Sequence, residues 1–495
     1  MPAQLIPITL PLPPQLPTIE GNVDYRQFRD QLLQIDQLLL RSGLEDQFIA
    51  TTVQDWLAKR QPTAKAQARF ELHCRRALRC TIARVLLGES YRPFAARLAD
   101  SPVLQYFCGL GEVDRVRVPS KSVLQRYDQW CPENRVRQLV EQLLRTAHRQ
   151  PERIALPEPL DLDAYFVDSC CVKANIHFPV DWVLLRDATR TLMKAVRLIR
   201  DQGLKHRMEE PEVFLRQMNR RCIQMAQART KFESQRKRKK ILRQIDRLVG
   251  IVRKHALRYR ALLDEQWEQT EWTRAQTEQV LRRMDHVLEL LPKARKQARQ
   301  RILQGEPVEN ADKLLSLYEV DARVITRRKA EAQVEFGNTL LLAENPQGLI
   351  LDWELFRETA PADARLLVRS LDRVQEVFAE APKAAGADRG FDSQHNQAAL
   401  AEREIYNGLC PRSPKELARR NKSWKFRKLQ QRRAQTEARI AIFKNNFLGR
   451  PLRSKGFASR SLSVAWAVLT HNLWVLARLR LAEAKAQAEA QALAA

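Results

Sequence analysis

Strand-like segments are few in this sequence, and their order restricts the folds that it can adopt. The first, at 160–169, is a short aromatic and β-branched run bounded by acidic residues, as expected of a buried strand. Three more follow within 318–356, separated by polar or glycine-containing turns, and their closeness predicts an antiparallel meander. A last one, at 381–391, ends in a glycine-flanked turn.

Helical patterning fills most of the remaining chain, including 25–148, 361–379 and the residues from Lys415 onward. The highly charged segment 181–317 also has apolar residues at alternating steps of three and four, which predicts a long helical hairpin with a coiled-coil seam. The order of strand, helical insertion, three strands, helix, strand and helices predicts an α+β fold built on a mixed sheet. The seam consists of Leu242, Ile245, Val249, Val252, Ala256, Tyr259 and Leu263.

A chain of 495 residues is long enough to hold several hydrophobic cores. We expect five parts, in chain order, with the sheet domain interrupted by the insertion. They are a proline-rich leader at 1–20, an N-terminal all-helical domain at 21–155, a sheet domain at 156–180 and 318–480, the helical insertion at 181–317 and a C-terminal tail at 481–495.

The net charge is strongly positive, +27 from 85 lysines and arginines against 58 acidic residues. Such an excess predicts a polyanionic partner, and nucleic acid leads because neutralising phosphates supplies affinity that does not depend on sequence. A protein that binds a membrane surface would carry one amphipathic basic segment, whereas the basic residues of this sequence are spread over the whole chain.

The N-terminal domain contains a candidate DNA-binding element. Segment 90–110 is typical of two short helices joined at Asp100-Ser101-Pro102, and another helix begins within 118–130, where Ser120 or Ser122 can cap it. Two interpretations stay open, a helix-turn-helix that binds DNA and a plain structural bundle.

Cysteine usage and hydropathy indicate a cytoplasmic protein without a membrane anchor. The eight cysteines form no Cys-x-x-Cys pair and no zinc-finger spacing, so we expect reduced, buried thiols. The leader lacks the basic start of a signal peptide. Segment 462–479 approaches the length of a membrane span, but it contains His471, Asn472 and Arg478, which favours a packed helix.

Three acidic residues have positions suited to catalysis. Asp168 ends the strand-like run AYFVD, and Asp388 ends the last strand, where Gly386 and Gly390 permit a sharp turn. Glu437 lies in a helical stretch, RRAQTEARIAIFK. Hard divalent cations prefer carboxylate oxygens, and two such ions can activate the attacking oxygen and stabilise the departing oxygen of a phosphoryl transfer.

Two cations accompany Glu437 along the predicted helix. Arg433 precedes it by four residues and Lys444 follows it by seven, spacings that place all three side chains on one helix face. A carboxylate flanked by two cations suits a DNA backbone, whose charge Arg433 and Lys444 would offset.

Five blocks of this sequence resemble, in order, bacterial insertion-sequence transposases of the DDE class, ISNCY-like in particular. The resemblance covers about 90–478. The blocks are VDSCCVKANIHFPVDWVLLRDATRTL at 167–192, YEVDARVITRRKAEAQVEFG at 318–337, GADRGFDSQHN at 386–396, RRAQTEARIAIFKNNF at 432–447 and LTHNLWVLAR at 469–478.

This resemblance implies a ribonuclease H-like catalytic domain, with an aspartate on the first strand, an aspartate after the fourth and a glutamate on a following helix. Asp168, Asp388 and Glu437 take those places and would bind two Mg²⁺ ions, for which Mn²⁺ can substitute. The implied protein is a DNA transposase of the bacterial cytoplasm, associated with the nucleoid. It would bind the terminal inverted repeats of a mobile element as a homodimer or larger assembly, cleave strands as an endonuclease and join the 3′-hydroxyl to target DNA.

The family's tyrosine, arginine, glutamate, lysine signature is matched at Arg433, Glu437 and Lys444 but not at Gln430, where the tyrosine would stand. Lys173 also occupies a position that is commonly uncharged or acidic in such proteins. Further DNA contacts are expected from Lys121 and Arg126 and from the basic run 236–240, whose alternative is a solvated helix face. The expected DNA contacts in that run are Arg236, Lys237 and Arg238, and the residues expected to shape the site are Asn175, His177, Asp181 and Arg389.

Three other functions are compatible with parts of the sequence. A metal-dependent DNA nuclease without strand transfer would use the same three acids. A non-catalytic DNA-binding protein derived from a transposase would be expected to have lost at least one of them. A basic coiled-coil scaffold would account for 181–317, but not for the acids at the strands on either side.

Overall fold

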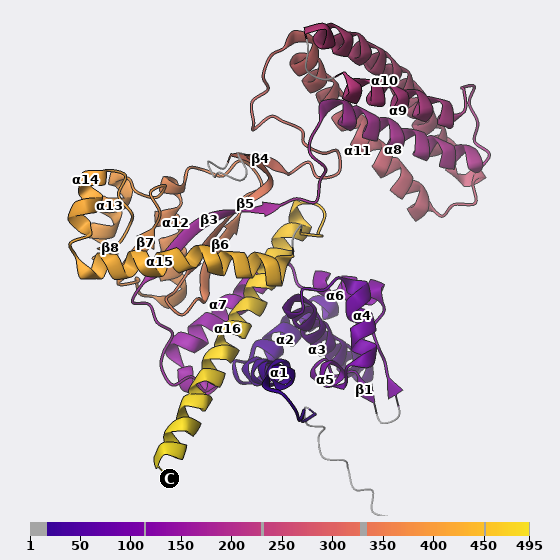
Figure 1. The fold of residues 1–495 in the computed structure, drawn as a ribbon. Coiled ribbons are helices and arrows are strands. Elements are labelled where there is room, and N and C mark those ends of the chain that lie inside the picture. The colour runs from indigo at the N-terminus through magenta and orange to yellow at the C-terminus, as the bar shows by residue number, and fades with distance from the viewer. Residues whose placement is uncertain (1–16, 113–114, 229–231, 327–333, 450–451, 495) are drawn as a thin grey trace, which may run out of the picture.

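The computed structural model describes residues 17–112, 115–228, 232–326, 334–449 and 452–494, so most of the predicted leader lies outside the described residues. The chain is an α+β protein in which helices surround one mixed sheet (Figure 1). The predicted mixed sheet is therefore confirmed.

Six strands form this sheet, and β3 (Tyr165–Lys173) lies near its middle. It pairs antiparallel with β5 (Val334–Glu344) on one side and parallel with β7 (Ala384–Ala387) on the other. Beyond β7 lies the parallel strand β8 (Tyr406–Asn407). Beyond β5 lie β4 (Arg323–Thr326) and β6 (Ile350–Leu355), both antiparallel to it.

The predicted meander needs a correction. In a meander the middle strand has one neighbour on each edge, but here β4 and β6 both pair with the same edge of β5. Gly337 shows this most directly, because it pairs with Arg323 of β4 and with Lys173 of β3 on opposite sides. The other edge of β5 is taken by β3, so its two sequence neighbours share the remaining edge.

Alternation along β3 assigns its side chains to the two faces of the sheet. Tyr165 points to α12 (Leu367–Phe378), where its hydroxyl donates to Ser370 at 2.7 Å. Phe166 points to the opposite face and packs with Leu429 of α15 (Trp424–Ile442). Asp168, two residues further on, shares the α15 face.

The described N-terminal region is helical except for a short pair of strands, so the all-helical prediction is wrong at 111–112 and 115–116. Two-residue strands β1 (Gly111–Glu112) and β2 (Arg115–Val116) pair there. The helices pack in one continuous hydrophobic core with the sheet and with α16 (Phe457–Ala494). They are α1 (Val23–Arg41), α2 (Leu44–Leu57), α3 (Ala64–Leu86), α4 (Tyr91–Asp100), α5 (Pro102–Phe107), α6 (Lys121–Gln129) and α7 (Glu133–Arg149).

The candidate helix-turn-helix contains the two short helices predicted at Asp100-Ser101-Pro102. The Ser101 hydroxyl accepts from the Leu104 amide at 3.3 Å and caps α5. Ser120 stands at the N-cap of α6, but its side chain makes no capping hydrogen bond, and Ser122 lies inside the helix. Ser120 therefore occupies the predicted N-cap position of α6, but its side chain does not cap the helix.

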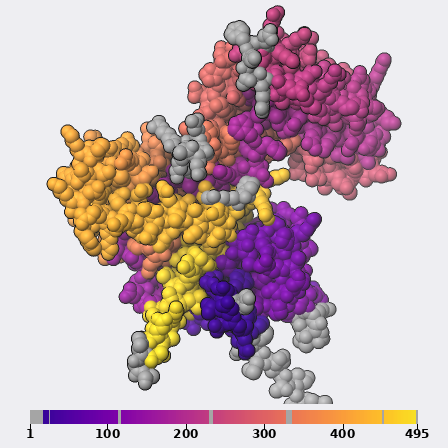
Figure 2. Space-filling view, in the orientation of Figure 1, coloured from indigo at the N-terminus to yellow at the C-terminus, as the bar shows by residue number. Residues whose placement is uncertain are grey.

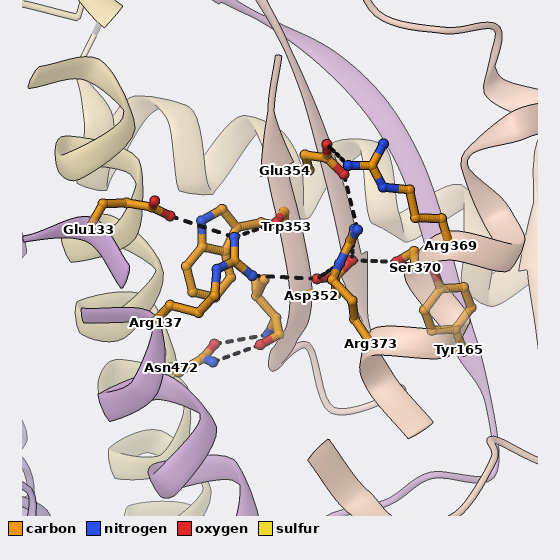
Figure 3. Close-up of polar contacts among 11 residues, drawn as sticks. Glu133, Arg137, Tyr165, Asp352, Trp353, Glu354, Arg369, Ser370, Arg373 and Asn472 are labelled. Atoms are coloured by element: carbon orange, nitrogen blue, oxygen red, sulfur yellow. Dashed lines mark hydrogen bonds and ion pairs between the residues drawn. The ribbon is translucent and has the colours of Figure 1, made fainter. Parts of the chain in front are cut away.

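A polar cluster joins the N-terminal helices to the sheet (Figure 3). Arg137 of α7 lies over the Trp353 ring, 3.9 Å from its centroid, and donates to the Trp353 carbonyl at 2.8 Å. The neighbouring Asp352 accepts two hydrogen bonds from Arg373, at 2.8 and 2.6 Å, and one from Ser370 at 2.5 Å. A helix of the N-terminal region, a sheet edge and α12 thus meet at one buried carboxylate.

The insertion after β3 is a helical lobe with its own hydrophobic core, set apart from the sheet (Figure 1, Figure 2). All seven residues of the predicted seam are buried in that core. The sequence predicted a hairpin, whereas four main helices pack together. They are α8 (Asp181–Asp201), α9 (Pro211–Gln227), α10 (Phe232–Gln266) and α11 (Arg274–Ala298).

Among the described residues, α16 is the one helix long and apolar enough to cross a membrane, and most of its apolar window is buried in the protein. Asn472 is buried in this helix without an unsatisfied polar group, because its side chain accepts from the Ile350 amide at 2.9 Å and donates to the Ile350 carbonyl at 2.8 Å. The packed helix predicted for 462–479 is therefore confirmed. The helix continues through most of the predicted tail, 481–495. All eight cysteines are free thiols, and only Cys410 is not fully buried.

Candidate functional site

Asp168 is the centre of the candidate site. The sequence placed it at the end of a strand, but β3 continues to Lys173, so Asp168 lies within the strand. The prediction failed because the following residues, Ser169 to Lys173, are paired by β5. On its other side, β7 ends sooner, and the last parallel pair is Val167 with Ala387. Asp168 is thus the first residue of β3 beyond β7.

Asp388 follows β7 directly, as predicted, so it continues the register one residue beyond Ala387 and lies beside Asp168. Its Oδ1 accepts from the Gly390 amide at 2.8 Å. A Cβ at Gly390 would lie 3.0 Å from that oxygen and 2.8 Å from Oδ2 of Asp363. The glycine therefore leaves the space that the Asp388 carboxylate occupies.

Glu437 is carried by α15, which lies across the same face of the sheet as Asp168. The helix is held there by Glu344 at the end of β5, a carboxylate that is 5% exposed. Its Oε1 accepts from Arg432 at 3.0 Å and from the Thr436 hydroxyl at 2.8 Å. Arg432 also lies over the Phe166 ring, 4.8 Å from its centroid. These contacts fix the helix turn that precedes Glu437.

The three acids interact electrostatically. The pKa of the Asp168 carboxyl is raised to about 7, first because burial removes it from water and next because the Asp388 carboxylate repels its charge. Glu437 repels it in the same way, while the Ser169 amide, at 2.7 Å, and Arg433 partly offset the rise. Carboxylates far apart in the sequence therefore act on one another across β3, β7 and α15.

The donor set has the chemistry that magnesium prefers, since all three groups are carboxylates. Among the residues that the structure describes, no three acidic, histidine or cysteine side chains lie close enough together to coordinate one metal ion as they stand. The site instead presents like charges whose repulsion a divalent cation would relieve. By donor type and by charge, Asp168, Asp388 and Glu437 fit such an ion.

The two cations predicted beside Glu437 differ in their surroundings. Arg433 acts on Asp168 electrostatically, and its buried Nε has no hydrogen-bond partner among the described residues. Lys444 does not continue the same α-helix, because α15 ends at Ile442 and 443–448 form a π-helix. The wider π turn changes the angle per residue, so the spacing rule that placed Lys444 on the face of Glu437 does not apply.

Gln430, which departs from the family signature, donates from Nε2 to the Gly408 carbonyl at 2.6 Å. It thereby connects α15 to the chain just after β8. Lys173, the other unusual residue, pairs with Glu335 at 3.1 Å across the β3–β5 ladder. Both side chains therefore have contacts that hold elements of the sheet together.

Asn175 and His177 lie beyond the end of β3 in a cleft of about 400 Å³ between the segment that follows β3, α8 and residues 315–319. Both side chains are exposed, and the cleft also contains Arg190 and Lys194. Asp181 has a different environment. It is 5% exposed and accepts from Gln297 at 2.8 Å and from Arg301 at 2.9 Å. These hydrogen bonds join the first residue of α8 to residues near the end of the insertion.

The remaining predicted contacts are distributed over the molecule. Lys121 and Arg126 are exposed on α6, and Arg236 and Lys237 are exposed on α10. Arg238 is partly buried, with its guanidinium 5.3 Å from the centre of the Trp182 ring. Arg389, exposed after Asp388, has its carbonyl bound by Arg412 at 3.1 Å.

Sequence reasoning missed Glu344 and its partner Arg432. The signal was present, because VEFGNTLLLAE ends a run of buried apolar residues with an acid, and a buried carboxylate needs a cationic or hydrogen-bonding partner. Its partner lies 88 residues further along the chain, so the pair becomes visible only in the fold.

Comparison with protein families, with curated proteins and with solved structures found no match. The interpretation of the site therefore depends on its own residues and geometry.

Proposed function

We propose that this protein is a DNA transposase of the DDE class, in which Asp168, Asp388 and Glu437 hold two magnesium ions. The observation that carries the proposal is the convergence of the three carboxyl groups: desolvation first, and then repulsion from Asp388 and Glu437, raise the pKa of Asp168 to about 7. Acids whose pKa is shifted by desolvation and by specific charged neighbours are typical of functional sites.

The arrangement of the sheet supports the same proposal. Asp168 lies on the first strand of the sheet in chain order, and Asp388 follows β7, which is the fifth strand, or the fourth when the short strand β4 is left out. Glu437 then lies on a later helix packed across these strands. This is the order expected of a ribonuclease H-like catalytic domain.

In the proposed reaction, bound magnesium supplies activation of a water or a 3′-hydroxyl and stabilisation of the oxygen that leaves phosphorus. The protein's own residues place the reacting groups. Asp168 and Asp388 provide ligands from rigid strands, and Glu437 provides one from the helix that closes over them. Arg433, directly N-terminal by one turn, offsets phosphate charge beside the acids. The strong positive charge of the chain, +27, favours DNA as the substrate.

The test uses a labelled duplex containing a terminal inverted repeat of the element, incubated with and without Mg²⁺. We expect a metal-dependent nick that Asp168→Ala, Asp388→Ala and Glu437→Ala each reduce to background while DNA binding persists. Glu376→Ala is the matched control, because Glu376 is an exposed acid on α12, against the other face of the sheet.

The outcomes separate the candidate functions. Nicking followed by joining to a second duplex supports a transposase, and nicking without joining supports a nuclease on the same site. Loss of DNA binding in all three variants, with binding kept by Glu376→Ala, would assign the acids a structural role instead.

A further inference from the structure

A dense cluster of positive charge lies just before Glu437 in the sequence. Residues 412–439 contain eleven lysines and arginines and only two acids, Glu416 and Glu437, a net charge of +9. Glu416 is already paired with Arg419 and Arg420, at 2.7 and 2.8 Å. Most of the remaining charge is therefore free to meet a polyanion.

Four residues of this segment form an exposed surface, which we call the docking surface: Lys422, Trp424, Lys425 and Lys428. All four are exposed, Trp424 to 66%. The three lysines have no ion pair among the described residues. The surface lies around the N-terminal end of α15, next to α14 (Pro414–Arg420), at the outer side of the sheet and away from the insertion lobe (Figure 1, Figure 2).

The ammonium groups are positioned by aromatic rings rather than by acids. Lys425 Nζ lies 4.4 Å from the centroid of Tyr406 on β8, and Lys428 Nζ lies 5.0 Å from that of Trp424. A ring face attracts a cation without neutralising it, so both charges remain available to solvent or to a ligand.

This end of the helix is also firmly joined to the catalytic strands. Phe426, 1% exposed, and Leu429, 9% exposed, are buried, and Leu429 packs with Phe166 of β3 and Ala384 of β7. Ser423 caps the helix by accepting from the Phe426 amide at 3.4 Å. The docking surface and Glu437 are thus two ends of one rigid helix.

Between them, the exposed side chains are small or uncharged. Gln431, Ala434 and Gln435 are exposed on α15 and carry no charge. The exposed stretch of α15 between the docking surface and Glu437 therefore carries no negative charge that would repel a phosphate backbone.

We propose that the docking surface binds the phosphate backbone of double-stranded DNA at a fixed distance from the phosphate that reacts at Glu437. The inference rests on the proposed function. Lys428 and Trp424 precede Glu437 by nine and thirteen residues, or about 14 and 20 Å at roughly 1.5 Å per helical residue. At about 3.4 Å per base pair, these distances correspond to roughly four to six base pairs.

Duplex DNA is favoured over other partners by charge and by shape. It carries one negative charge per about 1.7 Å of axis, which matches a dense cluster of unpaired lysines. A lipid surface would be met by a broad apolar face, whereas Trp424 is the single large apolar side chain of the docking surface.

The first test measures binding to a duplex of about forty base pairs containing the element's terminal repeat, in EDTA, over a range of salt concentrations. The docking variant combines Lys422→Gln, Lys425→Gln and Lys428→Gln. The control variant removes the same charge from exposed lysines of the insertion lobe, by Lys254→Gln, Lys293→Gln and Lys296→Gln. We expect the docking variant to lose about 2 to 3 from the slope of log affinity against log salt. A slope equal to that of the control variant overturns the proposal.

The second test locates the contact. Single phosphates of the same duplex are replaced by uncharged methylphosphonates, on both strands and both sides of the nick. We expect one or more substitutions roughly four to six base pairs from the nick to weaken binding several-fold by the native protein and not by the docking variant. Equal effects on both proteins at every position overturn the proposal.

The two proposals fail in different ways. If the docking variant shows the expected loss of salt slope but the native protein makes no Mg²⁺-dependent nick, the proposed function is wrong and the docking surface is supported. If the docking variant nicks DNA and its salt slope is unchanged, the docking surface is wrong and the proposed function is supported. All three substituted lysines are exposed, so thermal unfolding of the docking variant should match that of the native protein.

Discussion

Asp168 lies beside Asp388, each one residue beyond the last pair of two parallel strands, Val167 and Ala387. The strands hold the two carboxyl groups together whether or not a cation separates them. Asp168 is partly buried, and its pKa is raised to about 7 by desolvation and by the Asp388 carboxylate, while Glu437 on α15 adds to the repulsion. The fold therefore maintains a site that is unfavourable for three free negative charges.

The first prediction concerns pH and Asp168→Asn. The folded protein keeps a proton on Asp168 up to about pH 7, whereas an unfolded chain releases it near pH 4. Stability from this group is therefore complete below about pH 4 and is lost as the pH rises through 7. Asparagine cannot ionise, so the variant does not lose this stability. The free energy of unfolding of Asp168→Asn, relative to that of the native protein, should therefore increase between pH 4 and 8 by up to about 4 kcal/mol. Chemical unfolding in EDTA measures this difference, and a difference independent of pH would contradict the electrostatic assignment.

The second prediction concerns magnesium. A cation that binds the folded site and not the unfolded chain stabilises the protein, by about 2.7 kcal/mol at a hundredfold excess over its dissociation constant. We expect Mg²⁺ to raise the thermal unfolding temperature of the native protein near pH 8 and to do so less near pH 5, where Asp168 is protonated. Asp168→Asn should lose most of the effect, and Glu376→Ala should keep it. An equal rise in the native protein and Asp168→Asn would place the bound ion elsewhere.

Much of the sheet was predictable from local patterns. The strand-like runs, the helical insertion and the glycine-flanked turn at Asp388 each have a signal within about ten residues, because alternation and turn chemistry are local properties. The position of Asp388 after β7 and the helical setting of Glu437 followed from such signals.

The parts that sequence missed depend on partners distant in the chain. The ends of β3 are decided by β5 and β7, so the sequence placed Asp168 at a strand end although it lies inside one. The shared edge of β5 follows from β3 occupying its other edge. The π-helix after Ile442 changes the face of Lys444, and a 3.6-residue period cannot reveal that change.

The third prediction concerns the turn after Asp388. Gly390→Ala would place a Cβ 3.0 Å from Oδ1 of Asp388 and 2.8 Å from Oδ2 of Asp363, so the two carboxylates must move. We expect DNA nicking to fall at least about tenfold, because a displacement of about 1 Å is costly at a reacting centre. Gly111→Ala is the control, since nothing lies within 4 Å of a Cβ there. Full activity in Gly390→Ala would show that the position of Asp388 is not critical.

The fourth prediction concerns the buried carboxylate of Asp352, whose side chain is 4% exposed. Arg373 holds it with two hydrogen bonds, at 2.8 and 2.6 Å, whereas Arg137 lies 3.6 Å away (Figure 3). Removing one partner of a buried pair leaves an uncompensated charge, so Arg373→Ala should cost about 3 kcal/mol of unfolding free energy.

The matched control for this prediction is Arg282→Ala, which breaks the exposed pair of Arg282 with Glu278 and should cost less than about 1 kcal/mol. Urea unfolding of both variants measures the difference. Because Asp352 also accepts from Ser370, which in turn accepts from Tyr165 on β3, the loss of Arg373 should loosen the strand that carries Asp168. Reduced nicking in Arg373→Ala under conditions where it is still folded would show that this cluster supports the site, and unchanged nicking would confine its role to stability.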